Sequence, residues 1–411
     1  MRLAIRRLLT TSVLAAGAAL LAAGPARAGD LTTLVNFTGP NGAAPYAGLT
    51  DVNGTLYGTT NGGGSTFSSN NFGGGTVFSY SATGGLQTLV NFNPTTGFDP
   101  YAGLTNVGGT LYGTPFFGGG GLDGTVFSYS ASGGLQTLAS FIGANGANPV
   151  AGLIAVGGTL YGTTSGGGAS DGGYGTVFSY SASGGLQTLA SFTGSPNGAS
   201  PSSGLIDVNG TLYGTTLGGG SAGAGTVFSY SASGGLQTLA SFTGANGANP
   251  YAGLLDVGGM LYGTTSSGGG GSDGTLFSFD PQSNTITTLV TFNGGNGASP
   301  HAGLIDVGGM LYGTTYEGGS NGDGTLFSYS ASGGLQTLVN FTGTNGAEPW
   351  AGLIDVGNAL YGTTEVGGSG GQGTIFSYSL NTAESVPEPA SLTLLGAGIA
   401  GLALARRRRA G

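Results

Sequence analysis

The chain has 411 residues, 92 of them Gly and none Cys, so no disulfide can stabilise it. Its eight basic residues are all Arg and lie at or before Arg27 or after Ala405, whereas its 17 acidic residues lie between Asp30 and Glu388. Nucleic-acid binding needs cationic side chains that replace the counterions of phosphates. The charge distribution therefore excludes nucleic acid as a partner.

The first 28 residues have the pattern of a secretory signal peptide. Arg2, Arg6 and Arg7 precede an apolar run over residues 8–21, and Ala26-Arg27-Ala28 supplies the small residues of a cleavage site. We therefore predict export and a mature chain that begins near Gly29. The alternative is a membrane helix that is retained.

Residues 29–380 form a tandem array in which one unit of about fifty residues occurs seven times. Each copy contains Leu-Tyr-Gly-Thr, and successive copies are 49 to 55 residues apart. Such a period is typical of stacked or radially arranged units. The tyrosines of the seven copies are Tyr57, Tyr112, Tyr161, Tyr213, Tyr262, Tyr312 and Tyr361.

The copy that starts at Gly253 shows the pattern of one unit. Residues 254–257 are a short apolar run, Gly258-Gly259 supplies a two-residue hairpin turn, and residues 260–265 form a second strand. Residues 274–279 then predict a third strand, and the fourth has the pattern of residues 236–242 in the preceding copy. β-Branched and aromatic residues fill these segments.

Four antiparallel strands repeated seven times predict an all-β fold, a seven-bladed β-propeller. A β-solenoid is the competing architecture, but it needs capping units that this chain lacks. Residues 31–37 read as a fourth strand standing alone, and the last copy stops after its third strand at residues 373–379. We therefore expect the first strand to pair with the last blade and close the ring, with the recurring Phe and triplet Tyr side chains packed between blades.

The C-terminus carries three ordered features. Pro387-Glu388-Pro389 ends a linker over residues 381–389, and residues 390–405 are apolar. Arg406, Arg407, Arg408 and Arg409 follow, so residues 390–411 predict a short transmembrane segment with a cytoplasmic Arg cluster. The alternative is an ordinary tail anchor.

Together these features resemble the PEP-CTERM sorting signal of Gram-negative bacteria. The resemblance implies transient anchoring in the inner membrane, recognition by an exosortase-type processing enzyme, removal of the tail near residues 387–389, and delivery to the cell surface or its matrix.

The tandem repeat itself resembles the GloVer family of bacterial repeats. The likeness rests on copies such as AGLIDVGGMLYGTT at residues 302–315 and GDGTLFSYSASGGLQTL at residues 322–338. It implies an exported, surface-anchored repeat protein, and it implies no activity or substrate.

A candidate ligand site is formed by the residue that follows the loop proline in each copy. Each stands just before the first strand, so we expect all seven around the mouth of the central channel. Five are bulky or aromatic and are predicted to bind ligand: Tyr46, Tyr101, Tyr251, His301 and Trp350; the other two are Val150 and Ser202. The alternative is that they plug the channel or cap the blades.

First-strand acids form a second set. Carboxylates that converge on a channel could hold Ca²⁺, which prefers oxygen ligands. The competing interpretation is that each Asp caps its own hairpin turn. No other cofactor is predicted, and the residues concerned are Asp51, Asp207, Asp256, Asp306 and Asp355.

Catalysis has little support in the sequence. There is no Cys nucleophile, no Lys or Arg in the repeats, a single His, and no Gly-x-Ser-x-Gly motif, so we predict no catalytic residue and no enzyme. The expected function is an exported surface or matrix module that binds extracellular polysaccharide or a surface protein. One alternative is a polysaccharide-cleaving enzyme that uses the loop carboxylates Glu317, Glu348 and Glu365. Another is an architectural matrix protein without a specific ligand.

Overall fold

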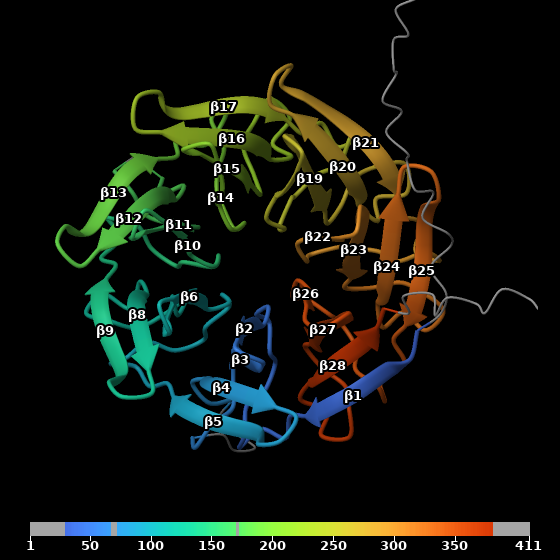
Figure 1. Ribbon diagram of the computed structural model, residues 1–411. Coiled ribbons are helices and arrows are strands. Elements are labelled where there is room, and N and C mark those ends of the chain that lie inside the picture. Colours follow the sequence, from blue (N-terminus) through green and yellow to red (C-terminus); the bar gives the residue numbers. More distant parts are fainter. Residues whose placement is uncertain (1–28, 67–71, 170–171, 381–411) are drawn as a thin grey trace, which may run out of the picture.

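Figure 1 shows the computed structural model of the protein, which describes residues 29–66, 72–169 and 172–380. Within these ranges all the regular secondary structure is β-strand, and the strands form seven antiparallel four-stranded sheets arranged in a ring. The prediction of an all-β, seven-bladed β-propeller is therefore confirmed. The predicted signal peptide and the predicted sorting signal lie outside the described residues.

Six blades are continuous in the chain, with the first strand innermost. First strands of neighbouring blades contact each other around the central channel. Blade 1 consists of β2 (Thr50–Val52), β3 (Thr55–Thr60), β4 (Thr76–Ser81) and β5 (Gly85–Asn91). Blade 2 consists of β6 (Thr105–Val107), β7 (Thr110–Gly113), β8 (Thr125–Ser130) and β9 (Gly134–Ser140). Blade 3 consists of β10 (Ile154–Val156), β11 (Thr159–Thr164), β12 (Thr176–Ser181) and β13 (Gly185–Ser191).

The next three blades repeat this order. Blade 4 consists of β14 (Ile206–Val208), β15 (Thr211–Thr216), β16 (Thr226–Ser231) and β17 (Gly235–Ser241). Blade 5 consists of β18 (Leu255–Val257), β19 (Met260–Thr265), β20 (Thr275–Asp280) and β21 (Thr285–Thr291). Blade 6 consists of β22 (Ile305–Val307), β23 (Met310–Thr315), β24 (Thr325–Ser330) and β25 (Gly334–Asn340).

Blade 7 joins the two ends of the described chain. It consists of β26 (Ile354–Asp355), β27 (Ala359–Thr364), β28 (Thr374–Ser379) and, as its outer strand, β1 (Leu31–Asn36). β1 pairs antiparallel with β28, from Leu31 opposite Tyr378 to Asn36 opposite Thr374. The blue and red strands lie side by side in Figure 1. The predicted closure is confirmed.

The core lies between blades rather than inside each sheet. The third- and fourth-strand Phe side chains are almost fully buried, and neighbouring blades bring them edge to face, as in Phe92 and Phe127 with ring centroids 5.3 Å apart. The same pairing closes the ring, because Phe37 of blade 7 meets Phe78 of blade 1 at 5.3 Å.

The Tyr of the Leu-Tyr-Gly triplet packs between blades as predicted, partly buried in most blades; Tyr57 of blade 1, for example, lies against the cluster that blades 1 and 2 share. The triplet Leu is buried in the same core in every blade, which was not predicted. In the register of the sheet the triplet Gly lies opposite the third-strand Phe, for example Gly263 opposite Phe277. A side chain there would displace the Phe, so the triplet Gly leaves room for one Phe at each blade interface.

Because the strands alternate in direction, the tight turns after the first and third strands share one face of the disc. The loops after the second strand and between blades therefore share the other face. The loop prolines belong to this second face, which holds the candidate site.

Candidate functional site

The loop that precedes each blade presents side chains to the channel mouth by a repeated backbone arrangement. The residue before each loop proline has a positive φ between 50° and 57°, and its carbonyl accepts a hydrogen bond of 2.9–3.2 Å from a residue shortly after the second strand of the same blade. The left-handed conformation before the proline turns the chain so that the residue after the proline faces the channel.

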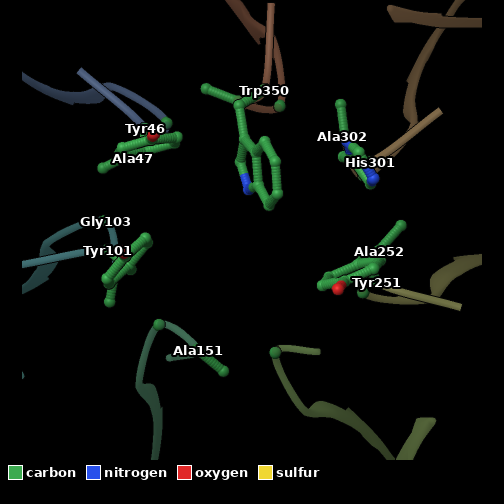
Figure 2. Close-up of a pocket in the computed structure, with 18 of the residues that line it drawn as sticks. Tyr46, Ala47, Tyr101, Gly103, Ala151, Tyr251, Ala252, His301, Ala302 and Trp350 are labelled. Atoms are coloured by element: carbon green, nitrogen blue, oxygen red, sulfur yellow. The ribbon is translucent and has the colours of Figure 1, made fainter. Parts of the chain in front are cut away.

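The predicted ligand residues do gather at the mouth, but as a crescent. All seven residues that follow the loop prolines line one open cavity, with about 550 Å³ of empty space including open solvent (Figure 2). Tyr251, His301, Trp350, Tyr46 and Tyr101 come from five consecutive blades, numbers 5, 6, 7, 1 and 2. Val150 and Ser202 on blades 3 and 4 leave the opposite side without aromatic rings.

Trp350 is the centre of the crescent. Its indole extends toward the middle of the mouth in Figure 2 and stacks on His301 with ring centroids 4.1 Å apart and planes at 25°. It also contacts Tyr46 at 5.3 Å and Tyr251 at 5.7 Å. The rings support one another and remain partly exposed, which is the arrangement expected for an aromatic platform.

Two carboxylates are held at the mouth by tyrosine hydroxyls. The Tyr46 hydroxyl donates to Glu365 Oε1 at 2.6 Å, and the Tyr316 hydroxyl donates to Glu348 Oε2 at 2.9 Å. Burial and these carboxylates raise the pKa values of Tyr46 and Tyr316 far above the usual range, so both hydroxyls stay protonated. Burial also raises the pKa of Glu365, although the tyrosine hydroxyls oppose the shift.

A third carboxyl group, Asp99, acts on Tyr101. Burial raises its pKa from 3.8 to about 6. The pKa of Tyr101 is itself raised, by burial first and then by the charges of Asp99 and Glu365. Asp99 and Glu365 therefore both act on the same tyrosine at the mouth.

Three buried side-chain atoms in the described part of the chain have no hydrogen-bond partner, and their residues either line the cavity or lie against tyrosines that line it. They are Asn61 Nδ2, His301 Nδ1 and Glu365 Oε2. Asn61 and Glu365 occupy the same repeat position, directly after the second strand, in the adjacent blades 1 and 7. Buried polar atoms are normally paired in a native protein, so unpaired ones indicate a place that a water or a ligand completes.

His301 is neutral at pH 7. Burial lowers its pKa to about 4, and its unpartnered Nδ1 lacks the carboxylate that orients the histidine of a Ser-His-Asp triad. In the crescent His301 therefore acts as a neutral aromatic ring with one nitrogen, Nδ1, that has no hydrogen-bond partner.

The first-strand aspartates lie at the hairpin turns, on the face opposite the mouth. Asp51, Asp207 and Asp256 accept hydrogen bonds of 2.8–3.0 Å from the turn residue three positions later, and Asn106 does the same in blade 2. Asp306 and Asp355 hold the same strand register and are exposed. In the described residues no group of three or more His, Cys, Asp or Glu is placed to hold a metal ion. Calcium binding stays a prediction.

The repeats match a known family of bacterial repeats. The Gloeobacter/Verrucomicrobia repeat matches residues 64–277 and 253–391, which is most of the chain. The chain belongs to this family. The PEP-CTERM protein-sorting motif matches residues 385–409, so the resemblance read from both motifs is confirmed. No curated protein matches the sequence.

The sorting motif identifies the family member as an exported surface protein of a Gram-negative bacterium, processed by exosortase-type machinery. In the part of the chain that the structure describes, no helix is long and apolar enough to cross a membrane. The predicted membrane segment, residues 390–411, and its transient anchoring in the inner membrane fall outside that part.

Solved structures with a similar fold are named as lactonases. A putative 6-phosphogluconolactonase from Bacteroides uniformis ATCC 8492 is 15% identical with a TM-score of 0.50 and covers 75% of this chain and 89% of its own. One from Bacteroides fragilis NCTC 9343 is 17% identical with a TM-score of 0.49 and covers 76% and 88%. The periplasmic gluconolactonase PpgL of Pseudomonas aeruginosa is 17% identical with a TM-score of 0.48 and covers 75% and 93%.

At these identities the likeness shows the propeller fold alone. It nevertheless corrects one prediction. A protein with this fold is named as a putative lactonase, so the prediction that the chain is not an enzyme is withdrawn. The scarcity of Cys, Lys and His does not exclude catalysis, because burial perturbs the carboxyl groups of Asp99 and Glu365.

Proposed function

We propose that this exported protein binds neutral carbohydrate at the crescent and hydrolyses it with the carboxyl groups of Glu365 and Asp99. The observation that carries the proposal is the convergence of unpaired buried atoms. His301 Nδ1 lies in the lining of the cavity, Glu365 Oε2 belongs to the carboxyl group bonded to Tyr46, and Asn61 Nδ2 lies next to Tyr101. Apolar ring faces beside a few polar atoms suit the C–H faces and hydroxyl edges of a sugar.

The two carboxyl groups supply acid–base chemistry. A raised pKa keeps the Glu365 carboxyl protonated at higher pH than a solvated one, so it can donate its proton to the oxygen of the departing group. Asp99, with a pKa of about 6, is mostly ionised at neutral pH and can accept a proton from the attacking water. The water oxygen bonds to the sugar carbon as the carbon–oxygen bond breaks. Tyr46 holds Glu365 in place through its hydroxyl.

Charge restricts the substrate. The chain has no Lys or Arg between Ala28 and Ala405, so nothing cationic is available to neutralise a phosphate, a sulfate or a uronic acid. The named fold relative from Bacteroides uniformis is a putative 6-phosphogluconolactonase, and from its name we carry over only hydrolysis of a sugar-derived bond. The substrate that fits this mouth is an uncharged glycoside or sugar ester.

The test uses the full chain, expressed with its export signals and purified, against neutral polysaccharides and aldonolactones. We expect release of reducing ends or of acid, and we expect Glu365→Gln and Asp99→Asn each to lower the rate about 100-fold or more while sugar binding persists. The control is Glu317→Gln, which removes an exposed carboxylate next to Tyr316 and should leave the rate unchanged.

Hydrolysis that survives both substitutions would contradict the assigned roles. Sugar binding without product would reject the hydrolysis. Neither binding nor release would reject the carbohydrate proposal and favour a surface-protein partner or a purely architectural role.

A further inference from the structure

Blade 2 departs from the other six blades beside the mouth. Every blade joins the loop before its first strand to the segment after its second strand by one isolated bridge. In six blades the loop partner is Ala, as in Ala147 opposite Gly166, whereas in blade 2 the partners are Phe98 and Phe117. The backbone hydrogen bonds are equivalent, 3.0 and 3.2 Å in blade 2 against 2.8 and 3.0 Å in blade 3. The bridge therefore does not require aromatic side chains.

These two rings begin an unbroken path to the crescent. Phe98 stacks on Phe117 with centroids 5.2 Å apart, and Phe117 contacts Phe116 at 4.5 Å. Phe116 then contacts Tyr101 at 5.3 Å, and Tyr101 contacts Tyr46 at 5.1 Å. All five rings are half-buried, so each leaves part of its surface open to solvent.

The second strand of blade 2 is shorter than those of the other blades and ends just before the ring path begins. Pro115 replaces the second Thr after the triplet, and β7 stops at Gly113 whereas the second strands of the other blades are six residues long. In the other six blades that Thr hydroxyl is hydrogen-bonded to the first Thr of the third strand, as between Thr164 and Thr176 at 2.8 Å. Blade 2 lacks this hydrogen bond, and its Thr125 hydroxyl donates to the Thr96 carbonyl at 3.3 Å instead.

We propose that Phe98, Phe117 and Phe116 form a subsite that receives further units of a neutral polysaccharide whose reacting unit lies at the crescent. This rests on the proposed function, because it takes the crescent to be the carbohydrate site. Partly exposed rings in series, each 4.5–5.3 Å from the next, suit successive sugar units, and a mouth without Lys or Arg suits an uncharged chain. A single sugar or a small lactone would leave the blade 2 rings unused.

The test is binding as a function of ligand length. The full chain, expressed with its export signals and purified, is titrated with glucose oligomers in β-1,4 and β-1,3 linkage and with mannose oligomers, each from two to eight units. We expect affinity to rise about tenfold or more between the dimer and the hexamer, as one or two aromatic contacts are added. Oligogalacturonides of equal length should bind at least about tenfold more weakly, because their carboxylates meet the acidic mouth.

The variant for this test is Phe98→Ala with Phe117→Gly, which restores the residues that blade 3 carries at its own bridge. We expect its affinity gain with length to disappear and its thermal midpoint to stay within about 2 °C of the parent chain. The matched control is Ile142→Ala, which removes an apolar side chain that is 62% exposed and is not one of the five rings. If the double variant unfolds, Phe117→Ala alone serves the same comparison.

The outcomes separate the two proposals. Affinity that does not depend on length, or a length dependence that survives the double variant, overturns the subsite and leaves the carbohydrate site in place. Equal binding of oligogalacturonides overturns the assignment to a neutral chain. Failure of every oligomer to bind overturns the proposed function and the subsite together, as would binding of peptides in their place.

Discussion

Glycine in the Leu-Tyr-Gly triplet is required by space rather than by backbone freedom. A Cβ on Gly263 would lie 2.8 Å from Phe277 Cζ and 3.1 Å from Leu254 Cδ2, both in the packed blade interface. Phe277 is fully buried, so its ring cannot move aside without opening a void. The same approach of a third-strand Phe occurs at the triplet Gly of every blade.

We therefore predict that Gly263→Ala lowers the free energy of unfolding by about 1–3 kcal/mol through overpacking. Chemical denaturation would measure it. Gly270→Ala is the control, because its added methyl group meets nothing within 4 Å in the same blade, and it should change stability by less than about 0.5 kcal/mol. Equal stabilities of the two variants would show that the interface yields freely.

Two ionisable groups, Asp99 and His301, destabilise the fold with opposite dependence on pH. The folded state holds the Asp99 proton up to a pH of about 6, whereas the unfolded chain releases it near 3.8. Asp99 therefore destabilises the fold increasingly as pH rises from about 4 to about 6. The pKa of His301 falls from 6.5 to about 4, so the unfolded chain takes up a proton first, and His301 destabilises the fold as pH falls through that interval.

Substitution of either residue should change the thermal midpoint, relative to the parent chain, by an amount that differs between pH 4 and pH 7. Asp99→Asn should raise the midpoint at pH 7, and most of this gain should vanish at pH 4, because Asp99 is then protonated when folded. His301→Phe should do the reverse, with its gain confined to acid pH. Scanning calorimetry of both variants checks the signs, and gains that do not vary with pH would refute the account.

At the scale of elements, β1 is the strand that decides whether the ring is closed. Its backbone pairs with β28, and Val35 and Phe37 enter the core cluster shared with Leu49, Leu56 and Phe78 of blade 1. Without β1, blade 7 would expose an unpaired edge and the blade 7–blade 1 interface would lose its Phe pair.

Deletion of residues 31–37 is accordingly predicted to lower the thermal midpoint by roughly 10 °C or more, because a buried Phe alone contributes about 3–5 kcal/mol. Thermal melting measures the loss, and a synthetic peptide of residues 31–37 should restore part of it. Thr32→Ala, at an exposed position of the same strand, is the control and should melt with the parent chain. An unchanged midpoint after the deletion would mean that the ring does not depend on β1.

At the scale of the whole molecule, repetition provides an internal comparison. Seven copies share the strands, the turns and the loop geometry, so a position where one or two blades differ stands out against the others. The blade 2 phenylalanines, Glu365 and Trp350 are such positions, and all of them lie on the loop face. The tight-turn face keeps close to the repeat pattern.

Much of the architecture could be read from the sequence, because strand patterns and turn residues act locally. The predicted second strand over residues 260–265 coincides with β19, and the predicted third strand over residues 274–279 differs from β20 by one residue at each end. Closure was also predictable, since the unpaired fourth strand and the incomplete last copy complement each other. The buried role of the triplet Leu was missed, because alternation alone does not say which face of an inner strand meets the next blade.

The sequence by itself determined the repeat, the seven blades, the closing strand and the sorting motif, each of which is written in contiguous residues. Only the tertiary structure decided the site. Tyr46 and Glu365 lie 319 residues apart and share a hydrogen bond because the ring places blade 7 beside blade 1. Which side chains meet, which lose water and which pKa values shift depend on that circular neighbourhood, and no local pattern encodes it.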